Sequence, residues 1–292
     1  MRNIQRKDRL GVYHMAEIHI SFKIENGIEL YFQTQDDVTE VDLSGRNIVE
    51  IDLSQLIQCK TLREINLSAN LIRSIDLSPL LECPSLEKLL IGSNLISSVD
   101  LTGLENCSNL DTLSLEINKL QRIDLSPLMS CLKLQELNLQ SNDFHEIDLS
   151  PLRRCSTLRF LRLDSNELYD IDLEPLSGCL NLQELFLESN QFDEVDLSPL
   201  RSCKALEGLW LRSVGILQVD LSPLRECPNL LWLDITENQM KTIDVTPLYY
   251  CHDLESFMID ETVPLMANVN LSYNLWPATL EEIKERIFWV NE

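Results

Sequence analysis

The stretch LQELNLQSNDFHEIDLSPLRRCSTL, residues 134–158, decides the fold because most of the chain repeats it every 24 residues. Three residue types keep this step along the sequence. They are asparagine (Asn70, Asn94, Asn118, Asn142, Asn166, Asn190, Asn238), cysteine (Cys59, Cys83, Cys107, Cys131, Cys155, Cys179, Cys203, Cys227, Cys251) and aspartate (Asp52, Asp76, Asp100, Asp124, Asp148, Asp172, Asp196, Asp220, Asp244). A fixed period of this size is typical of a solenoid, in which each unit buries its apolar face only against its neighbours.

A single unit has the pattern of a strand, a turn and a short helix. Leu137 and Leu139 alternate with polar residues as in a β-strand that is buried on one face. A buried Asn142 in the following turn can bond backbone groups that no regular ladder satisfies. Ser150 before a proline is typical of a helix start, with the hydroxyl as cap. We therefore expect a short helical turn over residues 151–155.

The pattern LxxLxLxxNxL, present as Leu134, Leu137, Leu139, Asn142 and Phe144, resembles the leucine-rich repeat. The resemblance covers residues 41–264, where nine units agree at several positions each. It implies an α/β horseshoe with a parallel β-sheet on the concave side and short helical or 3-10 turns on the convex side.

The N-terminal residues predict a tail and a cap. Residues 1–14 carry four basic side chains and are expected to be a basic, disordered tail, or an extension of a chain that naturally starts at Met15. Alternating apolar residues then flank Asn26-Gly27, a strong hairpin signal. We expect a hairpin cap over residues 15–40 that covers the first end of the solenoid at 41–264.

The C-terminal residues 265–292 depart from the repeat and predict a second cap. Thr279 and Glu282 have the spacing of a capping box. A short amphipathic helix is expected after them, with Leu280, Ile283 and Ile287 on its buried face.

Composition limits the partners that the chain can have. The net charge is −23, from 24 basic and 47 acidic residues. Such a surface repels nucleic acids and anionic membranes and favours basic protein segments. The sequence lacks a long apolar run and an apolar signal core. Nine cysteines without a CxxC spacing read as small buried side chains that stay reduced. We expect a cytoplasmic monomer.

Catalytic chemistry finds little support in the sequence. The four histidines occupy unrelated repeat positions, and no phosphate loop or HExxH motif is present. The aspartate series could hold calcium, but each IDLSPL segment offers one carboxylate and no glycine. We expect each aspartate to be solvated and bonded to a backbone N–H before the helix. The sequence predicts no catalytic residue, cofactor or metal.

The repeat pattern does not fix the residues at the strand positions that face the concave side. They are mostly polar in the first half of the solenoid, and from the fifth unit aromatic and arginine residues appear among acidic ones. They read Phe160, Arg162, Asp164; Glu184, Phe186, Glu188; Gly208, Trp210, Arg212; Trp232, Asp234, Thr236; Ser256, Met258, Asp260. Strands lie about 4.8 Å apart, so Phe186 and Trp210 should stack, and Gly208 should leave a dent. Val214 replaces the turn asparagine, so this unit should be looser or differently shaped.

These concave residues predict a non-catalytic module that binds a protein or peptide, with different roles for three groups of side chains. Phe160, Phe186, Trp210, Trp232 and Met258 are the expected apolar anchors. Arg162 and Arg212 would orient an acidic group or stack on rings. Asp164, Glu184, Glu188, Asp234 and Asp260 would steer a basic partner.

Three alternatives stay open at the level of sequence. The first is a regulatory subunit that controls an enzyme through an acidic edge or the convex face. The second is a small-molecule binder or enzyme at the Gly208 dent. The third is an exported, adhesin-like repeat protein, which the free thiols disfavour.

Overall fold

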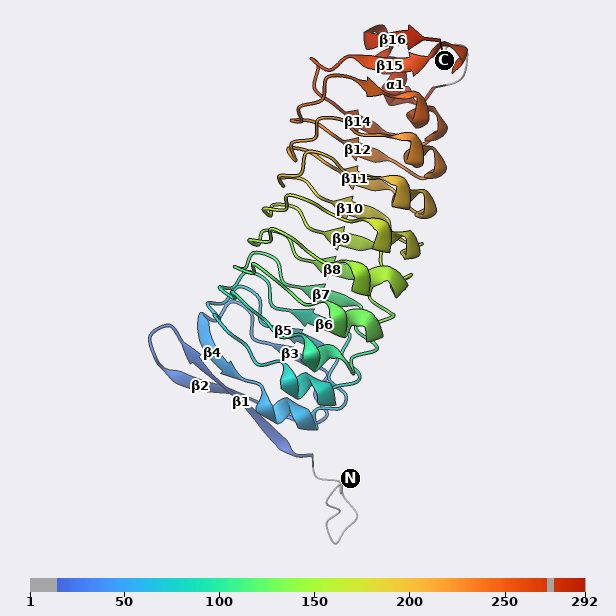
Figure 1. Ribbon diagram of the computed structural model, residues 1–292. Helices are drawn as coiled ribbons and strands as arrows, with labels where there is room; N and C mark the ends of the chain where they lie inside the picture. Colours follow the sequence, from blue (N-terminus) through green and yellow to red (C-terminus); the bar gives the residue numbers. More distant parts are fainter. Residues whose placement is uncertain (1–14, 272–275, 292) are drawn as a thin grey trace.

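The computed structural model describes residues 15–271 and 276–291 as one stack of coils, with the hairpin of the first described residues and the last strands at opposite ends (Figure 1). The predicted basic tail at residues 1–14 lies outside the described residues. One parallel sheet of ten short strands runs along the stack of coils. Its strands are β3 (Glu40–Asp42), β5 (Glu64–Asn66), β6 (Lys88–Leu90), β7 (Thr112–Ser114), β8 (Glu136–Asn138), β9 (Phe160–Arg162), β10 (Glu184–Phe186), β11 (Gly208–Trp210), β12 (Trp232–Asp234) and β14 (Ser256–Met258).

The register of this sheet follows the sequence period without a slip. Each strand residue pairs with the residue 24 positions further on, as in Phe186 opposite Trp210. The middle residue of each strand, such as Leu161 and Leu185, is buried in a continuous core. The predicted solenoid and its parallel sheet are confirmed.

Short 3-10 turns form a column along one side of the stacked coils, at the right in Figure 1. They are η1 (Ser54–Gln58), η2 (Ser78–Glu82), η3 (Thr102–Leu104), η4 (Ser126–Ser130), η5 (Ser150–Arg154), η6 (Glu174–Gly178), η7 (Ser198–Ser202), η8 (Ser222–Glu226) and η9 (Thr246–Tyr250). At all nine turns an exposed aspartate accepts the N–H two residues further on, at 2.8–2.9 Å. The expected backbone bond of the aspartates is confirmed.

The expected hydroxyl cap at the helix start is wrong. Ser150 is the first residue of η5, and its side chain donates to Asp148 Oδ2 at 2.9 Å. The carboxylate of Asp148 accepts the Ser150 N–H instead. The carboxylate is the stronger acceptor because it carries a charge.

The asparagines and cysteines tie neighbouring coils together inside the core. Asn118 is 2% exposed, and its Nδ2 donates to Leu115 O at 3.0 Å and to Ile91 O in the preceding coil at 3.1 Å. Its Oδ1 accepts the N–H of Ile96 at 3.0 Å. The nine cysteines are buried and free, and seven of them donate weakly to a leucine carbonyl of the preceding coil, as Cys227 does to Leu200 O at 3.4 Å.

The N-terminal cap is an antiparallel hairpin of β1 (Glu17–Ile24) and β2 (Glu29–Gln35). Its strand β1 pairs with β4 (Ile48–Asp52), the return segment of the first coil, and not with β3. Alternate residues of β1 are buried in the core, so the hairpin covers the core end from the return side.

The C-terminal cap also joins the return side. Strand β13 (Ile243–Asp244) pairs with β15 (Leu265–Asn268), which pairs with β16 (Ile287–Val290). Between the last two lie η10 (Val269–Leu271), α1 (Ala278–Glu282) and η11 (Lys284–Arg286).

The predicted capping box is wrong, and the predicted helix is too long. Pro277 is the N-cap of α1, and Thr279 Oγ1 accepts the N–H of Phe257 at 3.4 Å. Ile287 lies in β16, because the last coil still needs a strand partner for β15.

Candidate functional site

The concave side chains of β9, β10, β11, β12 and β14, and of the residue two positions after each strand, form three rows across the sheet, because every strand repeats the same register. We call them together the C-terminal concave surface. The first row is Phe160, Glu184, Gly208, Trp232 and Ser256; the second is Arg162, Phe186, Trp210, Asp234 and Met258; the third is Asp164, Glu188, Arg212, Thr236 and Asp260.

The centre of this surface is a three-layer stack. The rings of Phe186 and Trp210 lie 4.2 Å apart at 8°, as the register predicts. The guanidinium of Arg162 covers the other face of Phe186 at 3.9 Å. Phe186 is 8% exposed and yet does not belong to the hydrophobic core. Its neighbours on the concave surface bury it, in an arrangement that combines aromatic stacking with a cation–π contact.

The predicted dent at Gly208 is wrong. A Cβ atom at Gly208 would lie 2.1 Å from Cη2 of Trp210, so the six-membered ring of the indole lies over the glycine and fills the space. The glycine therefore admits the ring of its own strand. Trp232 is opposite Gly208 in the register and so flanks this ring.

The remaining predicted anchors lie at the margins. Phe160 is half-buried in the first row, and the guanidinium of Arg159 lies 5.1 Å from its ring. Met258 is 41% exposed on the last strand, beyond Asp234. The structure thus brings Arg162, Phe186 and Trp210 into one cluster, with the other anchors around it.

The predicted acidic residues are more buried than steering charges need to be. Asp164 is 4% exposed and Asp234 is 6% exposed, whereas Glu184, Glu188 and Asp260 are half-buried. The side chains of Ser165 and Gln140 act as donors to the carboxyl group of Asp164 and lower its pKa. Two other acids accept hydrogen bonds from nearby residues. Asp234 Oδ1 accepts from the N–H and hydroxyl of Thr236 at 3.0 and 2.6 Å, and Asp260 Oδ1 accepts the N–H of Glu237 at 3.1 Å.

Burial raises the pKa of several of these carboxyl groups. It raises the pKa of Glu188 to about 7, and the negative charges of Asp164 and Asp234 act in the same direction. It also raises the pKa of Asp164 and of Glu184. The positive charge of Arg162 opposes the shift at all three groups.

Arg212 lies near Asp234 and Glu188 but makes its ion pair with another residue. It is exposed and forms an ion pair with Glu237 in the turn of the next coil. This ion pair is the first cause of the raised pKa of Arg212.

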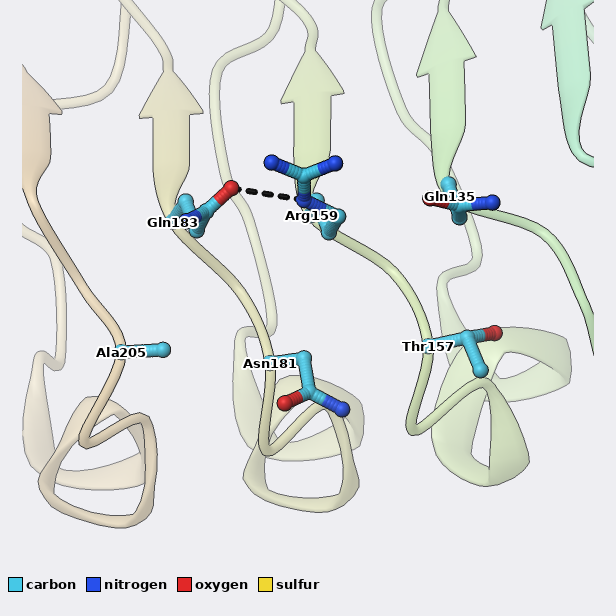
Figure 2. A pocket seen from close by; sticks show the side chains of 6 residues that line it. All are labelled: Gln135, Thr157, Arg159, Asn181, Gln183 and Ala205. Atoms are coloured by element: carbon cyan, nitrogen blue, oxygen red, sulfur yellow. Dashed lines mark hydrogen bonds between the residues drawn. The ribbon is translucent and has the colours of Figure 1, made fainter.

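A shallow polar cavity of about 260 Å³ lies beside the strands and was not predicted (Figure 2). Its lining is Gln135, Thr157, Arg159, Asn181, Gln183 and Ala205. Arg159 Nε donates to Gln183 Oε1 at 2.7 Å, and Gln183 Nε2 donates to Glu207 Oε1 at 3.0 Å. Arg159, Gln183 and Glu207 each precede a residue of the first row by one position. Their 24-residue spacing in the sequence could have revealed this chain of hydrogen bonds.

The turn that contains Val214 keeps the common shape at one residue and changes it at the next. Ser213 has φ 55°, as its equivalents do, but Gly215 has φ 96°. The N–H of Gly215 donates to Asn238 Oδ1 at 3.1 Å, whereas Gln239, the equivalent residue of the next coil, donates to the carbonyl of Ile216. Val214 supplies no amide, so the expected difference in shape is present at Gly215.

Within residues 15–271 and 276–291, no three metal-ligating side chains gather at one point. No helix in this part of the chain is long and apolar enough to span a membrane.

Comparisons with known proteins agree with the fold. Residues 84–144 match the family described as "Leucine rich repeat", and residues 11–110 match six copies of the "BspA type Leucine rich repeat region". No curated protein matches the chain.

Several solved structures are similar to this chain. An internalin (inlF) from Listeria monocytogenes is 24% identical, with TM-score 0.58, over 82% of this chain and 78% of its own. An internalin C2 (inlC2) from the same species is 29% identical, with TM-score 0.55, over 70% and 83%.

A third is the ectodomain of the plant membrane receptor kinase GASSHO1/SCHENGEN3 from Arabidopsis thaliana in complex with CASPARIAN STRIP INTEGRITY FACTOR 2. It is 20% identical, with TM-score 0.71, over 88% of this chain, which spans only 30% of the length of that ectodomain. The period, the asparagine ladder, the parallel sheet and these likenesses together make the chain a leucine-rich repeat protein.

Proposed function

We propose that this protein is a non-catalytic scaffold that binds a protein or peptide of basic character on its C-terminal concave surface. The observation that carries the proposal is the stack of Arg162, Phe186 and Trp210, which lies outside the hydrophobic core.

The side chains of Arg162, Phe186 and Trp210 have no role in forming the repeat. Leucines fill the core, asparagines bond the turns and aspartates start the 3-10 turns. Aromatic rings and arginine on a concave face are the residue types that dominate binding energy in protein interfaces. The corresponding positions on β5, such as Glu64 and Asn66, are polar.

The solved relatives and the charge support the choice of partner. The plant ectodomain named above holds a partner in its crystal structure. The net charge of −23 favours the approach of basic segments, because long-range attraction raises the rate of association.

The proposal is tested with a library of random 12-residue peptides displayed on phage and selected on the full chain. The double variant Trp210→Ala/Trp232→Ala should bind the selected peptides at least about 30-fold more weakly, since central aromatic residues contribute 2 kcal/mol or more. Its thermal midpoint should stay near that of the parent chain, because Trp210 and Trp232 lie outside the hydrophobic core.

Leu90→Ala is the matched control, because Leu90 is a half-buried apolar residue of β6 in the same row as Trp210. Peptide binding should survive this change. Equal binding by the parent chain and the Trp210→Ala/Trp232→Ala variant would refute the proposed surface.

A further inference from the structure

Two carboxyl groups meet in the third row beside the aromatic stack. Asp164 follows β9 and Glu188 follows β10, and the backbone ladder continues between them. The N–H of Leu163 donates to Phe186 O at 3.0 Å, and that of Ser165 donates to Glu188 O at 2.8 Å. The two acidic residues therefore lie on adjacent coils, whose backbones are about 4.8 Å apart in a sheet.

Each of these carboxyl groups has a buried oxygen without a donor. Asp164 Oδ1 and Glu188 Oε2 are shielded from solvent and accept no hydrogen bond from any residue that the structure describes. Asp164 is 96% buried, given its exposed fraction of 4%. Buried acceptors are almost always paired, and an unpaired one destabilises the fold unless something else supplies the donor.

Among the acids of this surface, a buried oxygen without a hydrogen-bond partner is specific to this pair. Asp234 and Asp260, on the same surface, have donors from Thr236 and Glu237. Lack of a donor is therefore not a general property of the acids on this surface.

The nearest cations of the chain are engaged elsewhere. Arg162 lies on the ring of Phe186, and Arg212 pairs with Glu237. Among the described residues, no ion pair within 4.0 Å includes Asp164 or Glu188. Both oxygens thus lack a cation as well as a donor.

We propose that Asp164 and Glu188 together receive a cationic side chain, lysine or arginine, of the bound peptide. The inference rests on the proposed function and names the group that the surface recognises. An ammonium or guanidinium carries several N–H donors and can bridge two carboxylates. The aliphatic stem of such a side chain would lie along the rings of Phe186 and Trp210.

A metal ion is the less suitable occupant. Calcium takes six to eight oxygen ligands, and the described residues gather no group of three carboxylate, histidine or cysteine side chains. A side chain that brings its own donors needs only the two carboxylates present.

The melting temperature of the unbound protein distinguishes a binding role of Asp164 and Glu188 from a structural one. The charged and titratable groups that face the pair are Arg162, Arg212 and Asp234. If the pair awaits a ligand, Asp164→Asn and Glu188→Gln each remove an uncompensated buried charge. Both variants should then melt at a higher temperature than the parent chain at pH 8. A pair that merely holds the coils together should melt lower after the same changes.

The experiment measures Kd by calorimetry for a peptide selected on the full chain. The Asp164→Asn/Glu188→Gln variant should bind at least 10-fold more weakly. A peptide whose lysine or arginine is replaced by glutamine should also bind the parent chain at least 10-fold more weakly. Its affinity for the double variant should be little lower than that of the original peptide for the same variant. Glu116→Gln is the control, because Glu116 occupies the same row two coils earlier and bonds Ser114 within its own coil.

The outcomes separate this inference from the proposed function. Peptides that depend on Trp210 but are indifferent to both carboxamide changes and to their own basic residues would overturn the inference alone. Peptide binding that does not depend on Trp210 and Trp232 would overturn both. A lower melting temperature for Asp164→Asn and Glu188→Gln would assign the pair to structure and overturn the inference.

Discussion

At the scale of single residues, each repeated position of the 24-residue period has one chemical role, and the exceptions lie on the proposed binding surface. Asp148 accepts a backbone N–H, Asn142 bonds two coils and Cys155 fills space between them. Asp164 and Glu188 have no such task within the coil. Sequence register predicts where a side chain starts but not how its rotamer turns, so it predicted the Phe186–Trp210 stack and missed the indole over Gly208.

The pH dependence of stability should report on Glu188. Its pKa rises from 4.5 to about 7 on folding, so the folded chain holds an extra proton between these values. The contribution of Glu188 is complete below pH 4.5 and is lost as pH rises through 7. The melting temperature of Glu188→Gln minus that of the parent chain should therefore be near zero at pH 4.5 and positive at pH 8.

Thermal melts of both proteins across this range check the prediction, with Glu116→Gln as control. A constant difference between pH 4.5 and pH 8 would contradict it. Burial raises the pKa of Asp164 as well, and the charge of Asp164 raises that of Glu188, so the two carboxyl groups titrate as a coupled pair.

At the scale of elements, the turn after each strand depends on one residue in the left-handed region. Eight such turns have φ of 53–57° at Ala69, Ser93, Ile117, Ser141, Ser165, Ser189, Ser213 and Glu237. The sequence predicted these turns from the asparagine that follows each of them but one. It did not predict the left-handed residue, because serine at that position is no signal for positive φ. Ile117 is the least suited to this conformation, since its side chain is β-branched.

Ile117→Asn should stabilise the protein by about 1 kcal/mol. A left-handed conformation costs about 1–2 kcal/mol for an ordinary residue and less for asparagine. Ile117 is 54% exposed, so little apolar contact is lost. Urea unfolding should show a higher midpoint.

Ile57→Asn is the control for this change, because Ile57 is 48% exposed and lies in η1 without a positive φ. Its unfolding midpoint should not rise. A gain at both positions would trace the effect to surface polarity and not to the backbone.

At the scale of the whole molecule, one core runs through all the coils and shelters a line of thiols. The period predicted this core and its buried cysteines, because every unit repeats the same apolar positions. The caps were harder to predict, since the period ends there. Strand β16 replaces the end of the expected helix, and the hairpin joins β4 instead of the concave sheet.

The nine thiols should be unreactive in the folded protein and fully reactive in denaturant. Burial raises the pKa of Cys155 and Cys203 to about 11 and that of Cys107, Cys179 and Cys251 to about 12. Thiolates are the reactive form, so little of it exists at pH 8. Titration with a disulfide reagent at pH 8 should find close to zero thiols before denaturation and nine after it. Rapid reaction of several thiols without denaturant would show that the coils open locally.

Both caps attach to the return segments of the terminal coils, through β1 with β4 and through β13 with β15. The contacts of each cap do not depend on the number of coils between the two caps, because an inner coil contacts only its neighbours. Gene duplications or deletions in steps of 24 codons would thus leave both junctions intact. The architecture allows the reach of the concave face to change in evolution while its ends stay the same.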